Sequence, residues 1–588
     1  VFLPLFALSG VEGRLFTPIA IATIVSMTAS FLVALTVIPV LCSYLLPDKL
    51  CKARAEDSFL TQWIKSAFTA TWLRFSLSQP FMILAIMGGL LWLSYQSFKN
   101  MGGNFLPPFQ EPSALVAMTT APGTSLKTTT ELAHVGQDLL LSIPGIKSVG
   151  FRAGRAERGD HVVPVSTVEF DIEFDKSSGR KQKEVIEDIR TTMRSIPGTF
   201  SSMSGPLADR VGHMLSGVSA KVAVKVFGPD LDELRRLGSQ IADVARGIPG
   251  LEEARTEQQA SVPQLRIEPD RKRALAYGVA PGDLNEELAT LMAGEKVAEI
   301  YEGTRKYDLV LRLPQEWREN PERLKQTYVD TLSGQRIPLE RVADIRRATG
   351  PNMILRENSQ RRFVVSINPT TENLNAAAER LQREVTEKVK LPKGYSISLE
   401  GEYQAQREAT SAIFYASTIL LILVFFLLYG HYRSFALAFL TLGIIPVSLV
   451  GAVLYTKYKL DNVSIATLVG FIAVSGIAAR NNIMLLTHYL HLMRNEGESF
   501  TRQMVERGTL ERLSPILMTA LSAGIALVPI LLALHEPGRE ILGPVAIAIV
   551  GGLVTSTLLG LAVTPSLFYA FCRKPVESIL AKDLNPDT

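Results

Sequence analysis

The chain alternates between long uncharged apolar runs and one long polar segment, and this pattern limits the fold more than any other feature of its 588 residues. A helix needs roughly 20 mostly apolar residues to cross a bilayer. Seven stretches qualify: 17–46, 81–98, 411–429, 436–456, 464–487, 515–534 and 541–571. The polar segment, 100–410, lies between the second and third of them. The sequence therefore predicts a helical membrane bundle with one large external domain, and excludes a soluble enzyme, a disordered chain and a secreted disulfide scaffold.

The chain begins inside an apolar run at Val1, with residues 1–8 resembling the end of a further span. We therefore interpret the chain as the later part of a longer protein. Lysine and arginine occur in the connections at 47–79, 430–435 and 488–514 and in the tail at 573–588. Cytoplasmic connections are enriched in these residues, so we expect all four on the cytoplasmic side and the polar segment outside. The stretch 57–78 is predicted to form an amphipathic helix on the inner membrane surface.

Charge and cysteine content give no sign of nucleic-acid binding or of disulfides in the external segment. The chain has 61 Lys+Arg and 57 Asp+Glu, a formal net charge of +4, which gives no argument for binding nucleic acid. The three cysteines, Cys42, Cys51 and Cys572, fall at or near predicted cytoplasmic span ends. The external segment contains none, so it must be stabilised by its own hydrophobic cores rather than by disulfides.

The external segment repeats a pattern of helix, Pro-Gly or Pro-Lys-Gly stop, and strand. The four copies occupy 137–151, 189–203, 241–255 and 385–399. Glycine just past a helix end supplies a left-handed cap, and the runs that flank the copies alternate as strands do. The repeat predicts α+β modules of the split βαβ, ferredoxin-like kind. An ordinary α+β domain without such modules remains the alternative.

These observations give a domain map. We predict spans at 1–46, a cytoplasmic connection at 47–79, a span at 80–99, a first module at 100–220, a second module in two parts at 221–268 and 353–410, an insertion at 269–352, a five-span bundle at 411–572 and a cytoplasmic tail at 573–588.

Arg480 is the only Asp, Glu, Lys or Arg in the seven predicted spans. An arginine deep in a bilayer costs several kcal/mol, and such residues usually face a protein interior on an ion or proton path. The alternative is an arginine that extends to the membrane surface, which lies about 10 Å away along the helix. Arginine stays protonated, so it cannot itself carry the proton. We expect its acidic partner in the part of the protein that precedes this chain.

The motifs and their order resemble the resistance-nodulation-division (RND) efflux transporters, most closely the heavy-metal branch. The resemblance covers nearly the whole chain, and its clearest motifs lie at 1–18, 32–47, 102–125, 213–228, 479–482 and 511–521. It implies a secondary active transporter rather than an enzyme. The implied protein is a homotrimer in the bacterial inner membrane, driven by the proton gradient and embedded in lipid.

The resemblance also implies partners and architecture. A periplasmic adaptor and an outer-membrane channel would be the partners, without nucleic acid and without a cofactor apart from the transported metal ion. The external segment would be a periplasmic porter domain, with the insertion at 269–352 as the part that docks toward the channel.

The family's proton-coupling residues transfer to four positions. Arg480 and Asn481 match a basic residue and an asparagine in the equivalent span, although copper exporters have an acid there. Arg512 and Thr519 match an arginine and a threonine of the next span. The family's acidic proton carriers belong to the first half and are absent from this chain.

The substrate is less clear from the sequence. Copper exporters of this branch use three methionines in a cleft of the porter domain, because soft sulfur ligands suit Cu(I) and Ag(I). Met214 matches one position, Met118 lies one step from another, and Thr167 occupies the third. One step along a strand turns a side chain to the opposite face. His213 and Met203 are nearby substitutes, so a soft ion, a borderline divalent ion and an organic compound all remain possible cargoes.

Other classes fit the sequence less well. An ATP-driven pump is excluded because the glycines at 212 and 217 are not followed by the Lys-Ser/Thr of a phosphate-binding loop. His488 and His491 could share a helix face, but no Cys or acid ligand is adjacent to them, so we assign them no metal role. The open alternatives to metal export are a multidrug RND pump and a protein-export accessory subunit.

Overall fold

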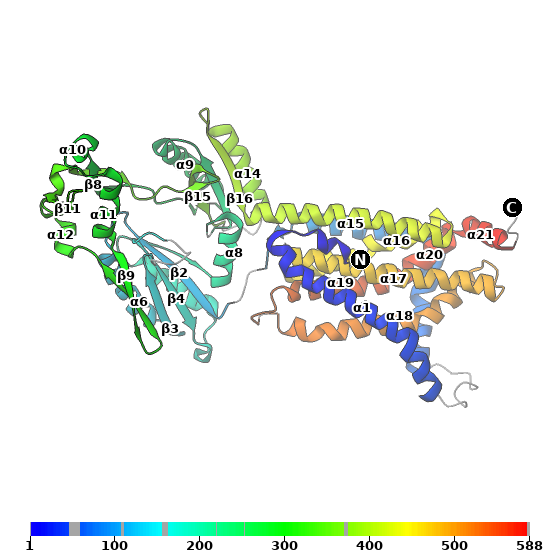
Figure 1. The fold of residues 1–588 in the computed structure, drawn as a ribbon. Coiled ribbons are helices and arrows are strands. Elements are labelled where there is room, and N and C mark those ends of the chain that lie inside the picture. Colours follow the sequence, from blue (N-terminus) through cyan, green and yellow to red (C-terminus); the bar gives the residue numbers. More distant parts are fainter. Residues whose placement is uncertain are drawn as a thin grey trace.

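The computed structural model describes residues 2–45, 59–107, 111–155, 163–218, 220–251, 253–369, 374–534 and 536–584. An elongated α+β domain lies beside a bundle of long helices, and the helix α15 extends along the bundle from the junction between them (Figure 1). Within these described residues, six helices are long and apolar enough to cross a membrane, and a bent pair can form a seventh span. The chain is a multi-pass membrane protein, as predicted.

The membrane helices agree closely with the predicted spans. They are α1 (Gly10–Leu45), α5 (Pro80–Lys99), α15 (Glu402–Tyr432), α16 (Phe435–Lys459), α17 (Ile465–Asn495), α18 (Arg502–Leu532) and the pair α19 (Leu542–Leu558) and α20 (Gly560–Phe571), which bends by 41°. The first of them begins at Gly10, ahead of the predicted start at residue 17, and therefore includes Glu12 within the helix. A short 3₁₀ helix, η1 (Leu3–Ala7), precedes it.

The predicted amphipathic segment is helical over its described part. It comprises α3 (Phe59–Phe68), a π-helical turn η2 (Thr69–Leu73) and α4 (Arg74–Ser78), while residues 57 and 58 lie outside the described residues. Leu73 and Leu77 are buried in the core of the helix bundle. Ser566 also donates a hydrogen bond to the Ser76 carbonyl at 2.7 Å. This segment therefore packs against the bundle as well as presenting an apolar face. The predicted tail contains a last helix, α21 (Arg573–Leu584).

Glycines allow three helices to approach one another closely at the centre of the bundle. A Cβ placed on Gly451 of α16 would lie 2.3 Å from the carbonyl oxygen of Gly551 on α19. A Cβ on Gly552 would lie 2.4 Å from the side chain of Val474 on α17. Because lipid gives helices little hydrophobic reason to associate, close backbone packing of this kind supplies much of the contact energy.

The first external module is a four-stranded antiparallel sheet. Its strands β2 (Ser113–Thr120), β3 (Ile146–Ala153), β4 (Thr167–Phe174) and β5 (Thr199–Ser204) are arranged in the order β3-β4-β2-β5. The connecting helices are α6 (Leu126–Leu141) and α7 (Gln182–Arg194), and together with the sheet they bury one hydrophobic core. The helix α8 (Pro206–Ser216) follows and leads to the second module.

The second external module is built from two separated stretches of chain. Strand β6 (Val222–Phe227) pairs with β15 (Gln360–Ile367) and with β16 (Ser396–Gly401), and the short strands β7 (Ala254–Thr256) and β14 (Arg356–Glu357) pair with β15. Helices α9 (Leu231–Arg246) and α14 (Leu374–Lys388) pack on the sheet and share its core.

An insertion separates the two stretches and has its own core. It is carried by the antiparallel pair β8 (Ser261–Pro269) and β13 (Ala343–Pro351). Its remaining elements are α10 (Arg271–Ala276), α11 (Pro281–Ala293), β9 (Glu295–Glu302), β10 (Arg305–Leu311), α12 (Gln315–Glu319), α13 (Pro321–Lys325), β11 (Tyr328–Asp330), β12 (Arg336–Pro338) and η4 (Leu339–Arg341). The insertion lies at the end of the molecule farthest from the helix bundle (Figure 1).

The two modules connect to the bundle differently. In the first module, β1 (Gly102–Gly103) pairs in parallel with β17 (Asn462–Val463), between α16 and α17. In the second module, β16 continues directly into α15. Gly401 at this junction has φ +109°, and a Cβ there would lie 2.6 Å from the Lys221 carbonyl oxygen, so only glycine fits.

Candidate functional site

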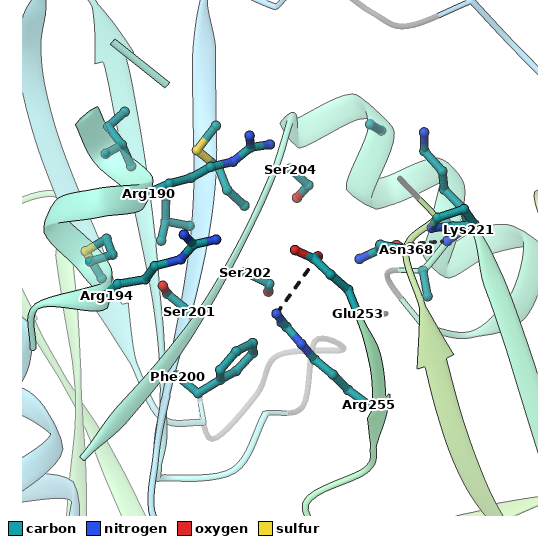
Figure 2. A pocket seen from close by; sticks show the side chains of 18 of the residues that line it. Arg190, Arg194, Phe200, Ser201, Ser202, Ser204, Lys221, Glu253, Arg255 and Asn368 are labelled. Carbon is teal, nitrogen blue, oxygen red and sulfur yellow. Dashed lines mark hydrogen bonds and ion pairs between the residues drawn. The ribbon is translucent and has the colours of Figure 1, made fainter. Parts of the chain in front are cut away.

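A cleft of about 680 Å³ lies between the two external modules. Helices α7 and α8 and strand β5 of the first module form one wall, and residues around β6, β7 and β15 of the second form the other. Arg190 and Arg194 extend into the cleft from the first module, and Arg255 and Glu253 face them from the second (Figure 2). The hydroxyls of Ser201, Ser202 and Ser204 lie along the strand between them. The cleft is therefore polar, in contact with solvent and shared by two bodies.

The charged side chains in the cleft are mostly basic. Its lining contains four bases and three acids: Arg190, Arg194, Lys221, Arg255, Glu187, Glu253 and Glu402. Arg190 contacts Glu187 at 3.4 Å, and Arg255 contacts Glu253 at 4.0 Å. The Arg255 guanidinium lies 3.7 Å from the centre of the Phe200 ring. Burial lowers the pKa of Arg255, which Glu253 opposes and the like charge of Arg194 reinforces.

A second cavity, of about 280 Å³, lies where the second module meets the helix bundle. Met214 of α8 lines it and has 63% of its surface exposed. Three carboxylates line the same cavity: Glu12 of α1, Glu400 of β16 and Glu408 of α15. Glu12 is only 6% exposed, whereas Glu400 pairs with the buried Lys225 at 2.6 Å. The structure thus brings Met214 together with acids that the sequence analysis did not consider.

The other predicted metal residues lie elsewhere. Met118 is fully buried in the core of the first module and lines neither cavity, whereas Val116, two residues earlier on β2, borders the cleft. Contact between Met118 and a substrate therefore stays a prediction, made for a side chain that lies inside the module core. His213 lies 3.7 Å from Asp209 on the same helix. Two other methionines, Met193 and Met203, line the cleft. Among the described residues, no group of three or more His, Cys, Asp or Glu side chains is arranged to hold a metal ion.

The two predicted coupling residues on α17, Arg480 and Asn481, lie on different sides of the helix. Arg480 is exposed on the outer surface of α17, whereas Asn481 is 8% exposed and lines a small cavity of about 20 Å³ with Asn482 and Ile516. The Asn482 amide donates to the carbonyls of Leu440 and Thr441, and its buried oxygen has no partner in the described part of the chain. This pocket joins α16, α17 and α18 around buried amides.

Arg512 and Thr519 lie along α18. The Arg512 Nη2 lies 3.4 Å from His488 Nδ1, and His488 Nε2 lies 2.7 Å from a Glu511 carboxylate oxygen. Thr519 is exposed and donates to the Ile516 carbonyl in its own turn. The sequence analysis missed the histidine link. Glu511 directly precedes Arg512 in the sequence, but its contact with His488 depends on how α17 and α18 pack, which no local pattern reports.

A sequence profile of the AcrB/AcrD/AcrF family matches residues 1–572. The chain belongs to the AcrB/AcrD/AcrF family. The predicted family resemblance is thereby confirmed, and members of this family are secondary transporters rather than enzymes.

The chain is similar along almost its whole length to several members of the family. Protein HelA of Legionella pneumophila is 30% identical over 97% of this chain and 55% of its own length. The cobalt-zinc-cadmium resistance protein CzcA of Cupriavidus metallidurans is 30% identical over 98% of this chain and 55% of its own. A crystal structure of a heavy metal efflux pump superposes with a TM-score of 0.79 at 28% identity, covering 98% of this chain and 57% of the other. The chain thus spans about half the length of the relatives it matches.

In this member of the family, a network of charged side chains extends from Glu400, at the second cavity, into the second module. Lys225, whose side chain is 3% exposed, pairs with Glu357 at 2.8 Å as well as with Glu400. Arg362 contacts Glu357 at 3.3 Å and interacts with Glu257, which follows β7. Desolvation raises the pKa of the Glu257 carboxyl to about 7, although Arg362 and the Val364 N–H oppose this shift.

The raised pKa of Glu257 makes the stability of the chain depend on pH. Because the folded state binds this proton more tightly than the unfolded state, its contribution is complete below the unfolded value of 4.5 and is lost as pH rises through about 7. We expect the melting temperature of Glu257→Gln to exceed that of the wild type at pH 8 and to match it at pH 5. Glu379→Gln, an exposed change on α14, should leave the pH profile unaltered. Identical pH profiles for wild type and Glu257→Gln would contradict the assignment.

Proposed function

We propose that the chain belongs to a proton-driven pump that exports heavy-metal cations across a bacterial inner membrane, with the external modules in the periplasm. The observation that carries this proposal is the likeness, over 98% of the chain, to a heavy metal efflux pump of known structure. Relatives named for cobalt, zinc and cadmium resistance support it. The cleft between two separate modules is also suited to alternate opening and closing by rigid-body movement.

The proposed coupling site comprises Arg480, Asn481, Arg512 and Thr519. Arg480 presents a permanent positive charge on an outer helix surface, and in the described residues it has no ion pair. Its role requires an acidic side chain supplied from outside these residues, which would gain and lose the transported proton. The buried amides beside Arg480 and the Arg512–His488–Glu511 contacts on the neighbouring helix would transmit this change.

The second cavity, between the second module and the helix bundle, is the proposed entrance for the ion. Met214 lines it, and His213 is the preceding residue on the same helix, α8. Glu400 is already paired with Lys225, which leaves Glu12, Glu408 and Met214 as the remaining donors of this cavity. Two carboxylates and a single thioether suit a divalent cation better than Cu(I), which prefers sulfur ligands. Charge and softness together therefore favour ions such as zinc, cobalt or nickel. The ion would then pass from this cavity to the cleft between the two modules on its way outward.

The entrance predicts different effects for two substitutions. In cells whose metal tolerance depends on the gene encoding this chain, Glu12→Gln is expected to reduce zinc and cobalt tolerance strongly, because it removes a buried negative charge. Met214→Leu keeps the volume and removes only the sulfur, so it should leave tolerance to these ions nearly unchanged, as should the exposed control Met518→Leu. Loss of silver tolerance in Met214→Leu alone would instead assign a soft cargo.

Export of organic compounds is the second candidate. It is favoured by the Phe200 ring and the row of serine hydroxyls in the cleft, and by the lack of a three-ligand metal group in the described residues. Drug susceptibility of the same cells separates the two functions. In either case we propose a homotrimer with a periplasmic adaptor and an outer-membrane channel, the insertion facing that channel. Crosslinking from exposed positions of the β9–β10 hairpin tests this arrangement.

A further inference from the structure

The charge in the cleft is unusual for a cation path. Each of the three acids has a basic neighbour: Arg190 contacts Glu187, Arg255 contacts Glu253, and Lys221 interacts with Glu402. Arg194 is the remaining base, and within the described residues its side chain has neither an ion pair nor a hydrogen bond. The positive charge of Arg194 is therefore uncompensated inside the cleft.

The position of Arg194 makes this excess charge available to a ligand. It extends from the end of α7 on the first module, and Arg255 faces it from β7 on the second (Figure 2). The two guanidinium groups are close enough for the charge of Arg194 to lower the pKa of Arg255. Two cations held on opposite walls repel each other, and a negatively charged group between them would reverse the sign of the interaction.

The surroundings of this pair are suited to recognising an anion with some hydrocarbon or aromatic character. The Phe200 ring covers one face of the Arg255 guanidinium at 3.7 Å, while Glu253 lies 4.0 Å from its N–H edge, beyond hydrogen-bond distance. The hydroxyls of Ser201 and Ser202 lie beside the pair and can donate further hydrogen bonds. Arginine binds carboxylate and phosphate oxygens through two parallel N–H groups, so two opposed arginines match a compound with more than one acidic group.

We propose that the cleft binds an anionic solute that carries carboxylate or phosphate groups, held between Arg194 and Arg255. This inference rests on the proposed function only in that the cleft is the transport path. The anion has two possible sources, a free organic acid or a metal ion enclosed in an anionic chelate. In the second case the metal leaves the acidic entrance cavity and crosses the basic cleft as part of a complex with net negative charge.

The test is isothermal titration of the purified full chain in detergent with three probes: citrate, the zinc–EDTA complex, and zinc ion alone. Citrate or zinc–EDTA should bind, and binding should weaken as salt is added, whereas any binding of zinc ion alone should be the same in Arg194→Gln as in the wild type. Arg194→Gln and Arg255→Gln should each weaken anion binding about tenfold or more, since each removes a charge-assisted contact. Arg236→Gln is the matched control, because Arg236 pairs with Glu233 on α9 away from the cleft.

The probes separate the two sources. Binding of zinc–EDTA without citrate assigns the chelate, and binding of citrate without zinc–EDTA assigns the free acid. The proposal is overturned if the wild type binds neither anion, or if Arg194→Gln binds both as the wild type does. Because Arg194 is exposed, this variant is expected to fold normally. Metal tolerance in cells is measured separately, so loss of the anion site would leave the proposed export function standing.

Discussion

Replacing Arg480 with alanine is expected to reduce export to the level of cells that lack the gene. The substitution removes the only charge in the middle of the predicted spans, and with it the group that would hold an acidic proton carrier in its ionised state. The side chain lies on an outer face of α17 and fills no part of the described core, so folding should be preserved. Metal efflux from loaded cells is the measurement, with the amount of protein in the membrane followed by immunoblot.

Two further variants make this result specific. Arg480→Lys keeps the charge and should retain part of the efflux. Lys459→Ala removes a cation at the end of α16, where the ammonium lies 5.3 Å from the Tyr458 ring, and should have little effect. Full efflux from Arg480→Ala, at normal protein levels, would rule out a role in coupling.

The second large effect is expected from Gly451→Ala, which should destabilise the bundle by about 3 kcal/mol. Alanine usually stabilises a helix relative to glycine by about 1 kcal/mol, so the expected sign is the reverse of the usual one. The reason is that the new methyl group would lie 2.3 Å from the Gly551 carbonyl oxygen. Thermal unfolding of the purified protein in detergent provides the measurement.

Gly443 on the same helix offers a matched control, because no atom lies within 4 Å of a Cβ placed there. Gly443→Ala should leave the melting temperature unchanged or raise it. If both variants melt at the wild-type temperature, the close contact between α16 and α19 does not contribute to stability as we infer.

The sequence predicted most of the helix bundle because a membrane span is a local property of about 20 residues. The start of α1 was missed, since Gly10–Phe16 is polar enough to end an apolar window although the helix continues through it. Glu12 was consequently left out of the candidate residues. Its burial depends on α15, which is distant in sequence, and no local pattern reports such a contact.

The cleft was predictable only in outline. The repeated helix–stop–strand pattern predicted two modules, but the meeting of Arg194 with Arg255 depends on how the modules pack. Family resemblance directed attention to Met118, whose inward position on β2 is set by strand parity. Two other methionines do line the cleft: Met193 lies on α7, and Met203 lies on β5 opposite Val116 of β2.

The continuous passage from β16 into α15 makes the second module and one membrane helix a single mechanical part. The Glu402 backbone N–H donates to the Lys221 carbonyl oxygen at 2.9 Å, which ties the start of the helix to the residue just before β6. The helix α15 has 31 residues and is about 46 Å long. A tilt of about 5° around its Tyr432 end therefore displaces its Glu402 end, where β16 joins it, by about 4 Å. A small tilt of α15 within the membrane would therefore displace the second wall of the cleft by several ångströms, whereas the first module has its own attachment to the bundle at β17.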